Sequence, residues 1–97
     1  MYMTILSGQV AKPNWARLEE TYERTFKHPH ENILASYLIH SHDETGLWQI
    51  ITIWRSKEAY EQARAAKHTE ICEQMFCDAG AIPQRIGFTV VECYQRI

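Results

Sequence analysis

The residues from Gly46 to Ala63 read G-L-W-Q-I-I-T-I-W-R-S-K-E-A-Y-E-Q-A, an apolar strand followed at once by the start of a helix. Side chains alternate between the two faces of a strand. One face therefore carries Leu47, Ile51 and Ile53, and the other carries Trp48, Ile50 and Trp54. An antiparallel sheet in a small domain usually leaves one face to water. Because both faces of this strand are apolar, the sequence predicts a sheet that is covered on both sides.

A helical region follows this strand. Ser56 is placed to cap its first turn, because a serine hydroxyl can accept a hydrogen bond from a free backbone N–H there. Apolar residues then continue at helical spacing from Tyr60 to Met75. We expect a break at residues 67–69, and Gly80 ends the region.

The chain upstream of this stretch begins with a strand and a helix. Weak alternation over Thr4–Val10 predicts the strand. The helix has an apolar stripe at helical spacing, formed by Trp15, Leu18, Tyr22 and Phe26. It must end near Lys27, because His28 precedes Pro29 and a residue before proline is pushed out of the α region.

Two further strands complete the pattern. The first, Ile33–His40, has Ile33, Ala35, Tyr37 and Ile39 on one face, and an acidic turn joins it to Leu47–Trp54 as a hairpin. The second is predicted over Phe88–Tyr94. The order β-α-β-β-α-β predicts an α+β, ferredoxin-like fold, with helices on one face of a four-stranded antiparallel sheet. The length of 97 residues predicts a single domain, residues 1–97.

The face of this sheet without helices would remain apolar. Monomeric proteins rarely expose large apolar patches, so we expect a homodimer in which two such faces pack together. The C-terminal strand would take part, with residues Tyr94–Ile97 extending over the partner.

Composition and charge exclude some partners and favour one compartment. The net charge of −2 gives no electrostatic basis for binding nucleic acid or an anionic membrane. The three cysteines form no C-x-x-C pair, and the N-terminus lacks the basic segment of a signal peptide. These features predict reduced thiols and a cytoplasmic protein.

Several segments together resemble one known family. They are Asn32–Tyr37 (N-I-L-A-S-Y), the acidic turn with Gly46, the segment Trp54–Tyr60 (W-R-S-K-E-A-Y) and His68. In this combination the chain resembles the antibiotic biosynthesis monooxygenase-like family of dimeric α/β barrels. The resemblance covers nearly the whole chain and rests mostly on structural motifs, so it specifies the fold better than the reaction.

The resemblance implies a reaction and a site. Active members oxidise a small aromatic or quinol-like molecule with O2 and use no metal or flavin, because the deprotonated substrate supplies the electrons. By this resemblance His68 is the candidate base. Trp54, Tyr37 and Tyr60 are the candidate residues that line a cavity for a small apolar or aromatic ligand.

Two departures from the family pattern favour a different hypothesis. Thr52 stands where many members carry a glutamate, and Ala63 stands where many carry a second histidine. A non-catalytic dimeric barrel that binds a small ligand, or only associates with itself, is therefore the alternative to an enzyme.

A third hypothesis is haem binding through His68. Haem-degrading relatives share the ending of the third strand but need an asparagine, a tryptophan and a histidine. Leu6 or Ser7, Ala63 and Glu73 stand at or near those positions here. Haem degradation is therefore disfavoured, whereas haem binding stays open.

The remaining histidines and cysteines give weaker signals. Two His-x-His pairs, His28 with His30 and His40 with His42, could each offer two imidazoles to one metal. No cysteine or carboxylate completes a recognised spacing, so we expect loop histidines in contact with water and no metal site. Cys72 and Cys77 lie about 140° apart around a helix, and we expect both to be buried, unpaired thiols.

Overall fold

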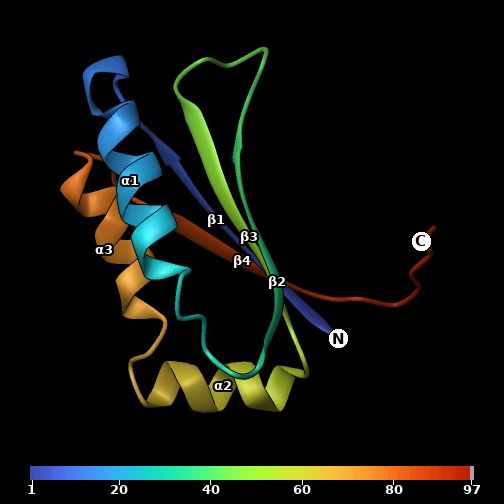
Figure 1. Ribbon diagram of the computed structural model, residues 1–97. Coiled ribbons are helices and arrows are strands. Elements are labelled where there is room, and N and C mark those ends of the chain that lie inside the picture. Colours follow the sequence, from blue (N-terminus) through green and yellow to red (C-terminus); the bar gives the residue numbers. More distant parts are fainter. Residues whose placement is uncertain (97) are drawn as a thin grey trace.

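Four strands form one antiparallel sheet in the computed structural model, which describes residues 1–96 (Figure 1). The strand order across the sheet is β2-β3-β1-β4, and the helices pack on one of its faces. The elements are β1 (Tyr2–Gln9), the 3-10 helix η1 (Lys12–Asn14), α1 (Trp15–Thr25), β2 (Ile33–His40), β3 (Leu47–Trp54), α2 (Lys57–Ala65), α3 (Glu70–Asp78) and β4 (Gln84–Thr89). The predicted α+β, ferredoxin-like arrangement is confirmed.

The central strand β3 shows the alternation that its sequence predicted. Every second residue is buried, namely Trp48, Ile50, Thr52 and Trp54, and the residues between them are half-buried. β1 pairs with β3 along its whole length, from Tyr2 opposite Trp54 to Gln9 opposite Leu47. The helices therefore cover the tryptophan face of β3.

A β-bulge in β2 separates residues that alternation had placed on one face. The register against β3 shifts between Ile33 and Ala35, so the alternation restarts there. Ile33 packs with Trp54 on the helix side, whereas Tyr37 pairs with Ile51 on the other face and is 55% exposed. The prediction that Ile33 and Tyr37 share a face is wrong, because alternation alone does not reveal an inserted residue.

The helical region breaks between α2 and α3, as predicted. Lys67 takes a left-handed conformation, with φ of 65°. The N–H of Lys67 donates to the carbonyl of Arg64 and the N–H of His68 to that of Ala63, both at 2.9 Å. This pair of bonds is a Schellman motif, which ends α2. It also ties the backbone of His68 to the last turn of that helix.

The last strand differs from its prediction. β4 spans Gln84–Thr89, whereas the sequence predicted Phe88–Tyr94. Pairing with β1 ends at Tyr2 opposite Thr89, and the N–H of Val90 then donates to the carbonyl of Met1 at 3.2 Å. Residues 91–96 lie outside the sheet and are exposed, on the side away from α1 and α3 (Figure 1).

Buried apolar side chains form two separate clusters on the helix side of the sheet. The larger, packed by α1 and α3, contains Leu6, Val10, Leu18, Trp48, Ile50, Met75, Phe76, Ala79 and Ala81. The smaller, beside α2, contains Trp54, Tyr60 and Ala63. α3 approaches β1 closely, since a Cβ on Gly8 would lie 2.5 Å from the Phe76 ring. Within residues 1–96 the two clusters are separate, and residues of both, including Leu6 and Trp54, line one cavity.

The opposite face of the sheet is largely apolar, with Ser7, Gln9, Gln49 and Gln84 as its polar residues, and no helix within residues 1–96 lies against it. By strand register it carries Met3, Ile5, Ala35, Tyr37, Ile39, Leu47, Ile51, Ile53, Ile86 and Phe88. We call this set the open face. None of the helices in residues 1–96 has the length and apolar character needed to cross a membrane. Ile97, part of the segment predicted to extend over a partner, lies outside the described residues.

Candidate functional site

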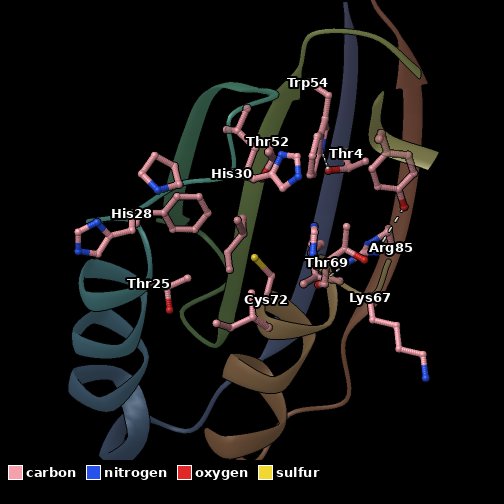
Figure 2. A pocket seen from close by; sticks show the side chains of 18 residues that line it. Thr4, Thr25, His28, His30, Thr52, Trp54, Lys67, Thr69, Cys72 and Arg85 are labelled. Carbon is pink, nitrogen blue, oxygen red and sulfur yellow. Dashed lines mark hydrogen bonds between the residues drawn. The ribbon is translucent and has the colours of Figure 1, made fainter. Parts of the chain in front are cut away.

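A cavity of about 480 Å³ opens on the helix side of the sheet (Figure 2). Its floor is formed by β1, β3 and β4, and its walls by the end of α1, the loop before β2, α2 and the start of α3. The lining residues are Thr4, Leu6, Thr25, Phe26, His28, Pro29, His30, Ile33, Ile50, Thr52, Trp54, Tyr60, Lys67, His68, Thr69, Ile71, Cys72 and Arg85. The volume lies in the range of pockets that hold small organic ligands.

Three of the four predicted site residues line this cavity. Trp54 and Tyr60 are buried in its wall, and His68 is exposed at its rim. Tyr37 lies on the open face, on the other side of the sheet, and does not line the cavity. The bulge in β2 accounts for the difference, because Tyr37 and the cavity-lining Ile33 fall on opposite faces.

A second histidine lies beside His68. The ring centres of His30 and His68 are 5.2 Å apart, and the His30 ring is 5.9 Å from the Trp54 ring. The backbone N–H of Asn32 donates to Nδ1 of His30 at 3.1 Å, so a neutral His30 carries its hydrogen on Nε2. Two imidazoles from distant parts of the chain thus meet at the cavity, whereas His28 lies apart from His30 (Figure 2).

Tyr60 and Arg85 form the polar part of the wall beside α2. Nη1 of Arg64 and Nη1 of Arg85 both donate to the Tyr60 hydroxyl oxygen at 3.3 Å. Nη2 of Arg85 lies 3.0 Å from Oε1 of Glu73 and donates to the Thr69 carbonyl at 3.4 Å. This arrangement puts a guanidinium group at the edge of an otherwise largely apolar space.

Two threonines give the floor of the cavity a polar strip. Nε1 of Trp54 donates to the hydroxyl of Thr4 at 3.2 Å, and this bond holds the indole ring across β1. Thr52 is buried beside them, at the position where many members of the resembled family carry a glutamate. A hydroxyl replaces a carboxylate there, so acid–base chemistry in this cavity depends on the histidines.

Cys72 contributes a thiol to the wall from α3. Burial raises the pKa of this thiol to about 11. The positive charge of Arg85 lowers the pKa by less than burial raises it, and the negative charge of Glu73 raises it slightly further. At neutral pH Cys72 is therefore an uncharged thiol rather than a nucleophilic thiolate. Cys72 is only half-buried and Cys77 is exposed, so the prediction that both helix cysteines are buried is wrong for Cys77, which lies on the outer side of α3.

Sequence reasoning missed Arg85 and underestimated His30. Arg85 lies before the predicted last strand, and only the true register of β4, with Arg85 opposite Leu6, turns it toward the helices. His30 was treated as a loop residue, although the constraint of Pro29 is a signal that this loop is rigid. In the described part of the chain, no three His, Cys, Asp or Glu side chains gather in a way that could hold a metal ion.

The fold and cavity define an α+β, ferredoxin-like protein with a ligand-sized space between its sheet and its helices. No protein-family model matches the chain, and no curated protein matches it in sequence. Solved structures do match it over nearly its whole length, and several of them are described as antibiotic biosynthesis monooxygenases.

Three of these structures illustrate the likeness. A protein of Deinococcus radiodurans described as an antibiotic biosynthesis monooxygenase has a TM-score of 0.77 at 10% identity, covering 100% of this chain and 99% of its own. A variant of SnoaB, a cofactor-independent oxygenase from Streptomyces nogalater, has a TM-score of 0.76 at 15% identity. The match covers 98% of this chain and 97% of the SnoaB chain. A variant of MhuD with two manganese protoporphyrin IX molecules per active site has a TM-score of 0.76 at 16% identity. The match covers 99% of this chain and 100% of the MhuD chain.

These structures confirm the resemblance to antibiotic biosynthesis monooxygenases at the level of the fold. The same fold occurs in SnoaB, named as an oxygenase, and in MhuD, named with a bound porphyrin. Fold does not fix function, so the reaction must be argued from the side chains of this cavity.

Proposed function

We propose that this protein is a cofactor-independent monooxygenase that oxidises a small aromatic or quinol-like substrate with O2. The observation that carries the proposal is the pairing of an aromatic wall with two imidazoles in one cavity. Trp54 and Tyr60 offer flat apolar surface to a planar ligand, and His30 and His68 lie together at the opening. An imidazole both takes and returns a proton near neutral pH, which suits a general base.

In the proposed reaction, His68 removes a proton from an activated ring position of the substrate. The resulting anion gives one electron to O2, and the two radicals combine to form a carbon–oxygen bond. The second hydrogen of the same carbon then passes as a proton to the distal peroxide oxygen while the O–O bond breaks, so that a carbonyl forms and hydroxide leaves. The hydroxide takes up the proton held by the imidazole and becomes water. One oxygen atom stays in the product and the other becomes water, so no further electron donor is needed.

His30 has a supporting part in this proposal. Nδ1 of His30 accepts the hydrogen bond from Asn32, so the hydrogen on Nε2 remains available to another group. The His30 ring also lies beside that of His68. A donor at this place stabilises negative charge that develops on oxygen during the reaction.

The homodimer belongs to the same proposal. A second copy of the chain is the occupant that best fits the open face, because that face is largely apolar and no helix within residues 1–96 covers it. Residues 91–96 are exposed and run out on this side, which places them to reach over a partner (Figure 1). A stable interface of this kind would bury at least about 1,200 Å² in total.

Oxygen uptake with a panel of hydroquinones and anthrone-like compounds tests the reaction. We expect consumption above the buffer blank with at least one compound, and a fall of about 100-fold in His68→Gln, the usual contribution of a general base. His42→Gln, in the exposed turn before β3, is the matched control and should leave the rate unchanged. A flat response across the panel would contradict an enzyme and favour the non-catalytic barrel that binds a small ligand or only itself.

Haem binding through His68 is the second candidate function. It is favoured by the exposed imidazole of His68 at the rim of a cavity in this fold. Titration with haem would then shift the Soret band, and His68→Gln would abolish the shift. The same spectrum without any shift would remove this candidate.

A further inference from the structure

The charge of the cavity is opposite to the charge of the protein. The whole chain carries a net charge of −2. The cavity, in contrast, is lined by Arg85 and by Lys67 at the rim, and no Asp or Glu among the described residues lines it. A low-dielectric space bounded by cations strengthens the attraction for a ligand with negative charge.

Arg85 is held in this wall with unused hydrogen-bonding capacity. Its side chain is only 13% exposed, yet Nε is buried without a hydrogen-bond partner in residues 1–96. Its bonds to Tyr60 and Thr69 are long, at 3.3 and 3.4 Å. Its one close partner, the carboxylate of Glu73, is 43% exposed and can return to water. The Nη groups of Arg85 are thus held by long or exchangeable contacts, so its guanidinium can bind an anionic oxygen in their place.

Tyr60 faces the same space with a free hydrogen. Its oxygen already accepts from two guanidinium groups, those of Arg64 and Arg85. A phenol oxygen that accepts in this way still has its own O–H to donate. The nearby indole of Trp54, with ring centres 5.3 Å apart, supplies a surface for an aromatic ring next to these donors.

We propose that Arg85 and Tyr60 bind a carboxylate, so that the ligand of this cavity is an aromatic acid and Arg85 determines specificity for it. A carboxylate is ionised at neutral pH and accepts two or more hydrogen bonds, whereas a phenol is not ionised there. The carboxylate displaces Glu73 from Arg85, and the ring lies along Trp54 toward the two histidines. The inference rests on the proposed function, because it names the substrate class of the same cavity.

Calorimetric titration with two probes of equal shape tests this assignment. The probes are 2-naphthoate and its neutral amide, 2-naphthamide, neither of which needs to be oxidised. We expect the acid to bind at least about tenfold more tightly than the amide, the usual gain from a charge-assisted hydrogen bond. Arg85→Gln should remove this difference between acid and amide. Its affinity for the amide should stay within about twofold of the wild-type value. Arg17→Gln, an exposed residue of α1, is the matched control.

A second variant keeps the test valid should Arg85→Gln fold poorly. Glu73→Gln removes the competing carboxylate, so the acid should bind about threefold more tightly or better, with no change for the amide. Equal affinity for acid and amide in the wild type, or no binding of either probe, would overturn the inference. Oxygen uptake combined with equal binding of acid and amide would overturn only the inference about the carboxylate. Tighter binding of the acid without any oxygen uptake would overturn only the proposed monooxygenase activity.

Discussion

At the scale of single residues, Trp54 connects the fold to the cavity. Its side chain is 4% exposed, packs with Tyr60 and donates to Thr4. We expect Trp54→Ala to lower the free energy of unfolding by about 3–5 kcal/mol, the range for removing a large buried aromatic side chain. Trp54→Phe should lose markedly less. A melting temperature of Trp54→Ala within a degree or two of wild type would show that the packing described for this residue is wrong.

Cys72 gives a second prediction at this scale, through its raised pKa of about 11 against an ordinary value of 9.0. The folded protein holds the thiol proton more tightly than the unfolded chain does. Burying the neutral thiol therefore favours the fold below pH 9, and this contribution is lost as the pH rises from 9 toward 11. The difference in unfolding free energy between wild type and Cys72→Ala should narrow across this window. A constant difference would mean that the thiol is not buried.

Single residues were also the hardest part of the site to predict from sequence. Trp54, Tyr60 and His68 were identified through a family resemblance and all lie at the cavity. Arg85 was missed because its orientation depends on the register of β4 against β1, which no local pattern encodes. The approach of His30 to His68 is a contact between a loop and a helix end that are far apart in the chain.

At the scale of elements, α3 depends on a glycine in β1. A methyl group on Gly8 would lie 2.5 Å from a ring carbon of Phe76, so the helix would have to move outward. We expect Gly8→Ala to cost about 1–3 kcal/mol of stability, the usual range for overpacking. Adding Phe76→Leu to Gly8→Ala should recover part of that loss. An unchanged unfolding midpoint in Gly8→Ala would contradict the close packing of α3 on the sheet.

The break between α2 and α3 gives another prediction. Lys67 occupies the left-handed position of the Schellman motif, where glycine has no steric penalty. Lys67→Gly should therefore keep or raise the stability, by up to about 1 kcal/mol, while Lys67→Val should lower it. Chemical denaturation of the two variants measures both effects. A loss in Lys67→Gly as large as that in Lys67→Val would contradict the left-handed conformation.

Elements were predicted well where their signal is local. The faces of β3, the helix break and the cap at Ser56, whose hydroxyl accepts from the Ala59 N–H at 3.0 Å, all follow from short-range patterns. The bounds of β4 were predicted wrongly, because they depend on its pairing with β1, which no local pattern encodes. The bulge in β2 was missed because one inserted residue leaves the apolar composition unchanged.

At the scale of the whole molecule, the apolar open face leads to the dimer prediction. Sedimentation equilibrium at micromolar concentration should give twice the mass of one 11.4 kDa chain, and the melting temperature should rise with protein concentration. Ile51→Lys, in the middle of this face, should produce a monomer or an unfolded chain. Arg17→Lys, on the helix side, is the control. A single-chain mass with a melting temperature independent of dilution would contradict the dimer.

Labelling with 18O2 tests the central claim, that the cavity oxidises an aromatic substrate without a cofactor. After treatment of the protein with a strong chelator, the product of an accepted hydroquinone or anthrone-like compound should contain one labelled oxygen atom. Its yield should equal the oxygen consumed, without hydrogen peroxide, because the second atom leaves as water. Unlabelled product, hydrogen peroxide in equal amount, or activity lost with the chelated metal would contradict the account.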